Sequence, residues 1–413
     1  MKKVLLIAYH FPPLGGGGVF RTLKFTKYLP EFGYQPHVLT VKNPMYRTKD
    51  PTLVREIPSY AKVYRTFSFE HRILRVPRLL NINLKWFYMP DENIGWLPFA
   101  ISVGTKVIKK KNISVIYATS PIWTNLLIGF FLKKKTKKPL VVDFRDPWTD
   151  NSFIRYPTKF HERFERKMEK IVLTQADYVT VATDSIKNTL IKKYPFIKSK
   201  IETVTNGFDP EDFKNLKIHE KTGKFRITYV GSIYGLLTAK PFLIALKELV
   251  EEKKEFREKV EVAFVGNYGK ETPHLVRKFG LEENVKFIEY VPHRKGLEFM
   301  VNSQALLLLI TLEGSKGEGI LTGKLFEYLA SRRPIIAIAP ENGLAANIIK
   351  SLNAGTVISP RKVQRIKKAI ADFYQQWIER KISTTPDNTG NITRYSRKVL
   401  THKLAQIFEK LTQ

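Results

Sequence analysis

A glycine-rich stretch of residues 314–323 carries the strongest chemical signal because it leads into an expected helix over Gly323–Ala330, with Thr322 at the N-cap position. Free amide groups at a helix start and a nearby ammonium group both attract anions, and a diphosphate suits that combination. Lys324 supplies the ammonium, and Glu327 could accept hydrogen bonds from two ribose hydroxyls. The plainer alternative is a capped helix with a surface glutamate. A P-loop is excluded, because a leucine follows the lysine.

A second group follows the first apolar run of the chain, where Gly15, Gly16, Gly17 and Gly18 are succeeded by Arg21. Glycines let the backbone approach a ligand closely, and amides at a helix start attract anions. The dinucleotide pattern G-x-G-x-x-G fails, because phenylalanine stands at its third glycine position. The alternatives are a flexible turn and an arginine that is a solvated surface charge.

A third group lies where an apolar strand runs directly into charged residues: Asp143, Arg145, Asp146, Trp148 and Asp150. Charges at the carboxyl end of a buried strand need partners or a chemical role. In one interpretation, one of these groups faces the reacting substrate. In the other, Arg145 pairs with a neighbouring aspartate and merely organises the loop. Smaller signals at 205–209, 230–233 and 290–294 are each explained by turn chemistry when taken alone.

These groups need elements to position them, and the sequence predicts an α/β fold with two halves. Continuous apolar runs are typical of strands buried on both faces of a parallel sheet. Strands are expected at 4–8, 36–41, 115–118, 140–144, 178–182, 226–231, 260–266, 285–288, 305–311, 335–339 and 355–358. Helices are expected at 19–29, 98–110, 124–134, 159–175, 241–252, 323–330, 344–352 and 395–411. The segment Ser383–Gly390 is polar and is interpreted as a linker.

Composition limits the function. The chain has 413 residues, no cysteine and a net charge of +32. Disulfides and thiolate metal sites are therefore excluded. Residues 1–205 hold 36 basic and 15 acidic residues, so most of the excess lies there. The lysine runs at 106–111 and 133–138 are either solvated helix ends or a surface for anionic lipid. No nucleic-acid-binding motif is visible, and no apolar run approaches the roughly 20 residues of a membrane helix. We expect a cytoplasmic protein that could lie on the inner face of the cell membrane.

The motifs in this order resemble the GT-B fold glycosyltransferases of family 4, also called group 1. The glycine loop with Arg21 resembles the family's N-terminal start, and residues 143–148 resemble an aspartate-rich loop found in one branch. Residues 204–209 resemble the crossing between domains, 229–232 the first strand of the second domain, and 323–331 the donor-site helix.

The resemblance implies two Rossmann-like, doubly wound domains facing across a cleft: an acceptor domain, 1–205, and a nucleotide-sugar domain, 206–390. A helix in 391–413 would cross back to the acceptor domain. It also implies sugar transfer from a nucleotide-sugar to an acceptor hydroxyl, with retention, in bacterial surface polysaccharide or glycolipid assembly. The partners would be that donor, a saccharide or lipid-linked acceptor and an anionic membrane surface, without nucleic acid. No metal or other cofactor is expected.

The resemblance also implies roles for single residues. Lys324, Glu318, Asp146 and Arg145 would be catalytic, and Arg21, Asp143 and Trp148 would belong to the acceptor side or its loop. The residues expected to bind the donor are Gly15, Gly16, Gly17, Gly18, Gly231, Ser232, Pro292, His293, Thr322, Gly323, Leu325 and Glu327.

Two positions depart from the family pattern. Gly319 stands where the first of two glutamates is usual, with Glu318 beside it, and Ser232 replaces an arginine. Lys324 is expected to supply the missing charge. Two alternatives stay open: a nucleotide-dependent oxidoreductase, and a non-catalytic protein of the same fold that binds a sugar or a membrane surface.

Overall fold

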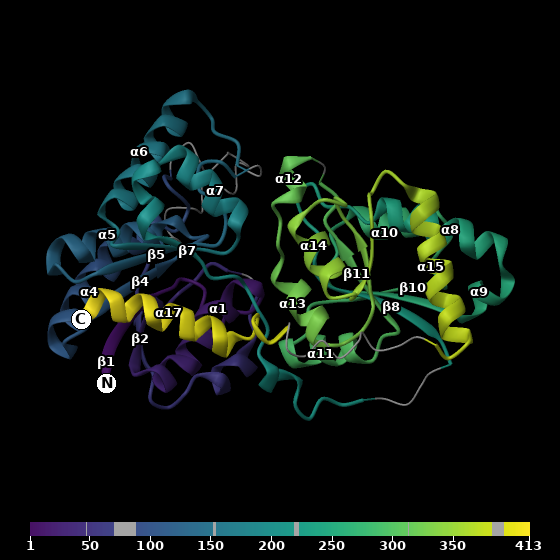
Figure 1. Cartoon of the computed structure of the whole chain (residues 1–413), viewed down its shortest axis with the longest axis horizontal. Helices are drawn as coiled ribbons and strands as arrows, with labels where there is room; N and C mark the ends of the chain where they lie inside the picture. The colour runs from purple at the N-terminus through teal and green to yellow at the C-terminus, as the bar shows by residue number, and fades with distance from the viewer. Residues whose placement is uncertain (47, 70–87, 152–153, 219–222, 313, 382–391) are drawn as a thin grey trace. The chain divides into compact units, whose positions relative to one another are not determined.

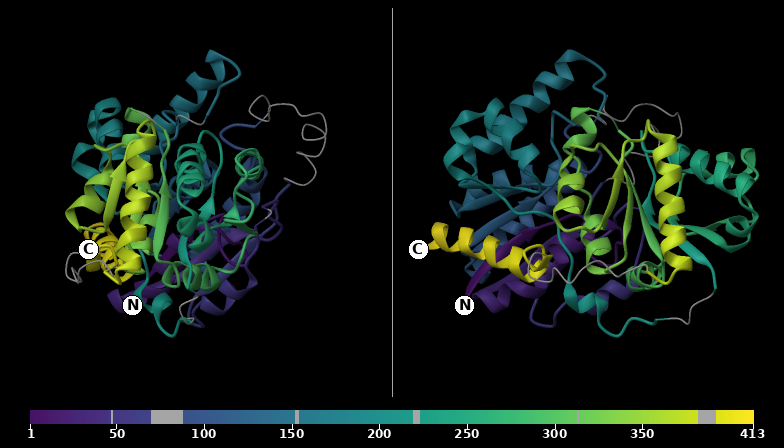
Figure 2. Two further views of the ribbon diagram at one scale, coloured as in Figure 1. Left: turned by 90° about the vertical axis from the view of Figure 1, so that its right-hand side faces the viewer. Right: turned by 45° about the vertical axis from the view of Figure 1, so that its right-hand side comes forward.

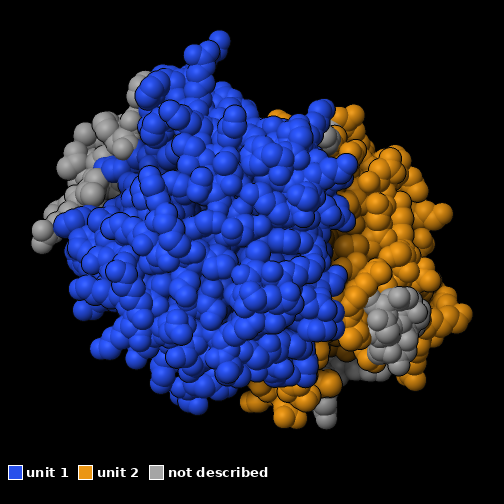
Figure 3. All heavy atoms as spheres, turned by 60° about the vertical axis from the view of Figure 1, so that its left-hand side comes forward, with its two compact units in different colours: residues 1–205, 397–413 blue, residues 206–396 orange. Residues whose placement is uncertain are grey.

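The computed structural model describes residues 1–46, 48–69, 88–151, 154–218, 223–312, 314–381 and 392–413. The chain forms two compact units, which Figure 3 shows in different colours. Unit 1 comprises Met1–Thr205 and Arg397–Gln413, and unit 2 comprises Asn206–Ser396. The linker expected at Ser383–Gly390 falls entirely within 382–391, outside the described residues.

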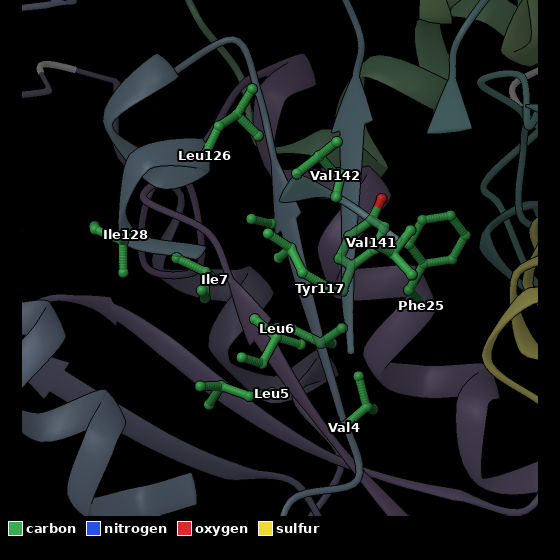
Figure 4. Close-up of a cluster of buried hydrophobic side chains, with 14 of the residues drawn as sticks. Val4, Leu5, Leu6, Ile7, Phe25, Tyr117, Leu126, Ile128, Val141 and Val142 are labelled. Atoms are coloured by element: carbon green, nitrogen blue, oxygen red, sulfur yellow. The ribbon is translucent and has the colours of Figure 1, made fainter. Parts of the chain in front are cut away.

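Unit 1 is built on a parallel sheet of seven strands in the order β3-β2-β1-β4-β5-β6-β7 (Figure 1). The strands are β1 Lys2–Ile7, β2 Tyr34–Val41, β3 Lys62–Thr66, β4 Val115–Thr119, β5 Leu140–Phe144, β6 Tyr178–Val181 and β7 Ile201–Thr203. In β1, Val4–Ile7 are completely buried, as their unbroken apolar run predicts. Figure 4 shows this run among Phe25, Tyr117 and Val141.

Helices connect the strands of unit 1. They are α1 Gly17–Tyr28, α4 Leu97–Lys111, α5 Trp123–Thr136, α6 Lys159–Gln175, α7 Asp184–Lys193 and α17 Arg397–Thr412. Short 3-10 turns lie at Leu29–Phe32 (η1), Pro51–Glu56 (η2), Ile94–Trp96 (η4) and Pro195–Lys200 (η5). The last helix of the chain, α17, packs on α1, η1 and β4 of the first unit. This confirms the expected return of the C-terminal helix.

Unit 2 holds a second parallel sheet, of six strands in the order β10-β9-β8-β11-β12-β13; Figure 2 shows the molecule from two further sides. Its strands are β8 Phe225–Ser232, β9 Val260–Asn267, β10 Val285–Ile288, β11 Ala305–Leu309, β12 Ile335–Ile338 and β13 Gly355–Ile358. Its helices are α8 Lys240–Glu252, α9 Lys254–Lys259, α10 Glu271–Lys278, α11 His293–Val301, α12 Ser315–Glu318, α13 Gly323–Ala330, α14 Leu344–Ser351 and α15 Val363–Ile378, after a 3-10 turn, η6, at Pro210–Phe213.

Both sheets are parallel with helical crossovers, the arrangement predicted from the apolar runs. In such sheets the carboxyl ends of all strands lie at one edge, and ligands bind in the loops there. In unit 1 the segments after β1, β4 and β5 lie at the carboxyl edge of the sheet. In unit 2 the segment after β8 and the start of α13 lie at the carboxyl edge of the second sheet. No helix among the described residues is long and apolar enough to cross a bilayer.

Candidate active site

In unit 2, the side chain of Lys324 lies against the end of β8. Its Nζ donates a hydrogen bond of 2.6 Å to the hydroxyl of Tyr229 and lies 4.0 Å from the centre of that ring. Gly231 makes room for it: a Cβ at this position, where φ is +132°, would lie 2.7 Å from the ammonium nitrogen. Burial lowers the pKa of Lys324 to about 7, although the nearby Glu327 carboxylate raises it. The structure therefore brings together Lys324 and Gly231.

The carboxylate of Glu327 is held by a histidine from another helix. His293 is the first residue of α11, after Pro292 at the N-cap, and its Nε2 lies 3.0 Å from Oε1 of Glu327. Both side chains are partly exposed. The helix that carries Glu327 is anchored to β8, because the Tyr328 hydroxyl accepts a 2.9 Å hydrogen bond from the amide of Val230. His293 and Glu327 are both expected to bind the donor, and the structure shows that their side chains are in contact.

Thr322 was expected to cap the start of α13, and the structure confirms only its position there. This residue occupies the N-cap position, but its side chain makes no capping hydrogen bond, and its buried Oγ1 has no partner among the described residues. A Cβ on Gly323 would meet no atom within 4 Å, so the space beside the helix start is open. Leu325 is completely buried in the core, so only its backbone could contact a ligand.

Two further predicted residues lie at exposed ends of elements. Ser232 is the exposed last residue of β8, and its carbonyl accepts a 2.7 Å hydrogen bond from the hydroxyl of Tyr229. Glu318 ends α12 and is exposed. No contact joins Glu318 to Lys324 or Glu327 in the described part of unit 2, so its expected role stays a prediction.

In unit 1, Arg21 and Asp143 form a buried ion pair and are both 0% exposed. The guanidinium donates from Nε and NH2 to the two carboxylate oxygens, at 2.9 and 2.7 Å, and also to the carbonyls of Val204 and Thr205. Arg21 is therefore not the solvated surface charge of the alternative interpretation. The pair joins α1, β5 and the end of β7, so it organises the carboxyl edge of the sheet from within.

Arg145 holds the glycine loop. Its NH1 and NH2 donate to the carbonyls of Gly18 and Gly17, at 2.7 and 3.3 Å. No ion pair within 4 Å joins Arg145 to a neighbouring aspartate in the described part of unit 1: Asp143 pairs with Arg21, and Asp150 pairs with other cations. The charge of Asp146 still acts on Arg145, since it raises the pKa of the guanidinium against the larger lowering effect of burial. Asp146, beside Arg145, is exposed at the end of the strand.

The glycine loop is tightly constrained. Gly15 donates its amide to the carbonyl of Thr48. Gly16 has a φ of +84° at the N-cap of α1. A Cβ on Gly18 would lie 2.7 Å from Nδ1 of His10, whereas one on Gly17 would have no atom within 4 Å. Burial is the main reason that the pKa of His10 falls to about 4. Gly15, Gly16 and Gly18 therefore hold the loop in a defined conformation against neighbouring segments.

Trp148 is a core residue of unit 1. It is 0% exposed, stacks on Trp123 with ring centres 5.2 Å apart, and donates from Nε1 to Glu165 of α6 at 3.0 Å. Thr149 similarly donates from its hydroxyl to the buried Glu169, at 2.8 Å. Of the two places expected for Trp148, the acceptor side or its loop, the structure shows the loop: the buried ring anchors the segment after β5 on α6.

A small pocket, open to solvent, lies at the carboxyl edge of unit 1. It is lined by Ala8, His10, Gly18, Thr22, Thr119, Ser120, Pro121, Ile122, Asn125 and Arg145. Three of these residues have a buried polar atom without a hydrogen-bond partner among the described residues: Thr22 Oγ1, Asn125 Oδ1 and Arg145 Nε. Buried polar atoms without partners are costly, so this pocket is suited to a polar ligand.

The residues of these sites that were missed from the sequence include His10, Thr22, Asn125, Tyr229 and Tyr328. His10 lies three residues after the end of β1, and Tyr229 lies inside β8; their positions near the carboxyl ends of apolar strands could have indicated them. Asn125 is inside α5, where the sequence gives no signal for it.

Family models match nearly the whole chain in two consecutive parts. The model for glycosyltransferase family 4 matches residues 15–212, and that for glycosyl transferases group 1 matches residues 211–385. Together with the two parallel sheets, these matches show that the chain belongs to the group 1 glycosyltransferases of the GT-B fold.

Individual relatives agree with this class. The chain is 24% identical to an uncharacterised glycosyltransferase of Methanocaldococcus jannaschii, over all of both proteins. It is 27% identical to the capsular polysaccharide biosynthesis glycosyltransferase CapH of Staphylococcus aureus, over 51% of this chain and 57% of that protein. Its fold is similar to that of HepE from Anabaena, solved in complex with UDP, with a TM-score of 0.66, 14% identity and all of both chains covered.

Proposed function

We propose that this glycosyltransferase uses a nucleoside-diphosphate sugar, which unit 2 binds beside β8 and α13. One observation carries the proposal: Lys324, Glu327 and His293 converge at the carboxyl edge of the sheet. The ammonium and the free amides of α13 suit a diphosphate, and the Glu327 carboxylate suits ribose hydroxyls. HepE, a protein of similar fold, was solved with UDP.

Lys324 has the chemistry to assist the bond-breaking step. When the bond between the sugar's anomeric carbon and the diphosphate breaks, negative charge grows on the departing phosphate. A cation fixed in advance stabilises that charge more than the substrate's own charge. In this proposal, Lys324 and the amides of α13 do this work without a metal ion, and the acceptor hydroxyl replaces the diphosphate with retention at the anomeric carbon.

The pocket of unit 1 is the proposed place for the acceptor. Its unpartnered atoms, Thr22 Oγ1, Asn125 Oδ1 and Arg145 Nε, need polar partners, and saccharide hydroxyls both donate and accept hydrogen bonds. Asp146 is exposed at the same edge of the sheet and would approach the sugar. Arg145 would act by holding the glycine loop that borders the pocket.

The biological setting that we propose is assembly of a bacterial surface polysaccharide or glycolipid. Two observations support it: the relation to CapH and the strongly basic first half of the chain. A lipid-linked acceptor is presented at a membrane, and clustered basic residues attract anionic headgroups. We therefore place the protein on the inner face of the cell membrane as a peripheral protein.

Turnover of nucleotide-sugars tests the proposal. The purified protein is incubated with UDP-, GDP- and dTDP-sugars and a lipid-linked saccharide, with and without EDTA. Release of nucleoside diphosphate is measured, and NMR gives the anomeric configuration of the product. We expect turnover of one donor class, retained configuration and activity in EDTA. Lys324→Met should reduce turnover at least about a hundredfold, the usual loss on removing one transition-state donor, whereas Lys278→Met, an exposed lysine on α10, should not. Absence of turnover with every donor would contradict the proposal.

A further inference from the structure

Helix α6 of unit 1 presents an unusual exposed face. Phe160 is 66% exposed and Phe164 is 41% exposed, and their rings stack with centres 6.1 Å apart and 18° between planes. Lys159, Arg163 and Lys167 are exposed on the same helix. We call the five residues 159, 160, 163, 164 and 167 the α6 face. Large aromatic side chains are seldom left in water without a binding role when they are gathered with cations.

The acidic residues of α6 do not neutralise this face. Glu165 and Glu169 are completely buried, where they accept hydrogen bonds from Trp148, Thr149 and neighbouring groups. Glu162 pairs with Arg166 one turn further along. The cations of the α6 face are therefore not matched by the carboxylates of their own helix. Two of the helix's three acids, Glu165 and Glu169, point inward, whereas the cations and aromatic rings of the α6 face point outward.

The position of the α6 face within unit 1 is also informative. Glu165 and Glu169 contact the loop that follows β5, so the middle of α6 lies at the carboxyl edge of the sheet. Its last residue, Gln175, comes just before β6 begins at Tyr178, so the helix end lies at the opposite edge. Residues 159–164, the first turn and a half of α6, therefore extend roughly 9 Å beyond the contact with the loop after β5. They lie at the same edge of the sheet as the proposed acceptor pocket. Figure 1 labels the helix.

The two lysine runs lie elsewhere. Lys111 ends α4 shortly before β4 begins, and Lys133 of α5 pairs with Asp177, which directly precedes β6. Both runs are therefore at the amino edge of the sheet, away from the pocket. A membrane-bound acceptor must enter at the carboxyl edge, so charge alone does not select the docking surface.

We infer that the α6 face docks unit 1 on an anionic lipid bilayer, with Phe160 and Phe164 entering the headgroup region and the flanking cations contacting anionic headgroups. This inference rests on the proposed membrane-linked acceptor and specifies the surface that meets the membrane. Charge complementarity selects the bilayer as the occupant: an anionic surface satisfies the cations, and its interface accepts aromatic rings.

Vesicle co-sedimentation of the full chain, without sugar substrates, tests the inference. Vesicles of phosphatidylcholine with 30% phosphatidylglycerol should bind the protein at least about tenfold more strongly than vesicles of phosphatidylcholine alone. Phe160→Ser/Phe164→Ser should lose about tenfold of that binding. Arg163→Glu/Lys167→Glu should lose thirtyfold or more, since each basic residue near such a surface contributes roughly fivefold.

Lys134→Glu/Lys135→Glu is the matched control, because it makes the same change of charge at exposed positions of the other edge. It should stay within about threefold of the wild type. Equal loss in both charge variants, or unchanged binding by the phenylalanine variant, would overturn the inference. So would a lipid-free dimer in sedimentation velocity that the phenylalanine variant abolishes, because the face would then be a contact between two copies.

UDP and GDP binding by the same variants separates this inference from the proposed function. If vesicles bind as expected but no nucleotide does, the docking surface stands and the proposed donor site is wrong. If a nucleotide binds but the vesicles do not, the donor site stands and the docking surface is wrong.

Discussion

Replacing Asp143 by asparagine removes one partner of the buried ion pair in unit 1. The carboxylate receives two hydrogen bonds from Arg21, and hydroxyl hydrogen bonds from Thr119 and Thr180, at 2.6 and 2.7 Å. The amide keeps the shape of the side chain but leaves the guanidinium of Arg21 buried without a counter-charge. We therefore expect Asp143→Asn to destabilise unit 1, because the positive charge of Arg21 stays buried without its carboxylate.

The size of the effect follows from burial, since both side chains are 1% exposed or less. Breaking such a pair by removing one partner costs about 3–5 kcal/mol. For a domain of this size, each kcal/mol lowers the melting temperature by about 2–4 °C. The variant should therefore melt roughly 6–20 °C below the wild type.

The pH dependence of stability provides a second test. Burial raises the pKa of Asp143, but the charge and hydrogen bonds of Arg21 outweigh it and hold that pKa below its ordinary value. The pair therefore stabilises the fold fully above the unfolded pKa of about 3.9, and this stability is lost as the pH falls through the lower folded pKa. Asp143→Asn should lack this part of the acid dependence.

Urea and thermal unfolding, followed by circular dichroism, measure the change. Glu162→Gln is the control, because it removes a partly exposed pair with Arg166 that should be worth at most about 1 kcal/mol. A loss for Asp143→Asn no larger than that of the control would refute the reasoning that this pair organises the edge of the sheet.

Three further predictions concern the two candidate sites. Because the pKa of Lys324 is about 7, its side chain loses its positive charge above pH 7. The affinity for a nucleoside diphosphate, measured by calorimetry, should therefore fall by up to about tenfold for each pH unit above 7. In Lys324→Met this pH dependence of the affinity should vanish. His293→Ala removes the partner of Glu327, the carboxylate proposed to bind ribose, so KM for the donor should rise about three- to tenfold while kcat changes little. An equal fall in kcat would assign the histidine another role. Gly18→Ala should lower both the melting temperature and activity because its Cβ would lie 2.7 Å from His10, whereas Gly17→Ala, with no atom within 4 Å, should leave the melting temperature unchanged.

The central strands could be predicted from the sequence because each is an unbroken apolar run. β5, β10 and β13 were predicted to the residue, and the other predicted strands within a few residues. Helix α15 was missed, although its buried Ile366, Ile370, Phe373 and Tyr374 follow helical spacing. Strands β3 and β7 were missed for a physical reason: they are the two edges of the seven-stranded sheet, where side chains are partly exposed and no apolar run is required.

The sites were less accessible to prediction, because long-range partners decide what a charged residue does. Arg21 and Asp143 are 122 positions apart, and nothing local indicates that they neutralise each other. Lys324 was selected for a diphosphate from its helix alone, but the lowered pKa depends on its burial beside Tyr229 and Gly231 of a distant strand. Local spacing and the family resemblance indicated the residues of the proposed donor site, and only the fold shows how those side chains are held.

Nucleotide binding tests the central claim most directly. Thermal unfolding of the wild type is measured with UDP, GDP, dTDP, CMP and NAD, and repeated for Glu327→Ala and for the control Glu283→Ala, which removes an exposed carboxylate of unit 2. A ligand at a hundred times its dissociation constant stabilises a protein by about 2.7 kcal/mol. We predict such stabilisation by one nucleoside diphosphate, lost in Glu327→Ala and kept in Glu283→Ala. Stabilisation by NAD alone, or by none of the five, would contradict the donor site proposed for unit 2.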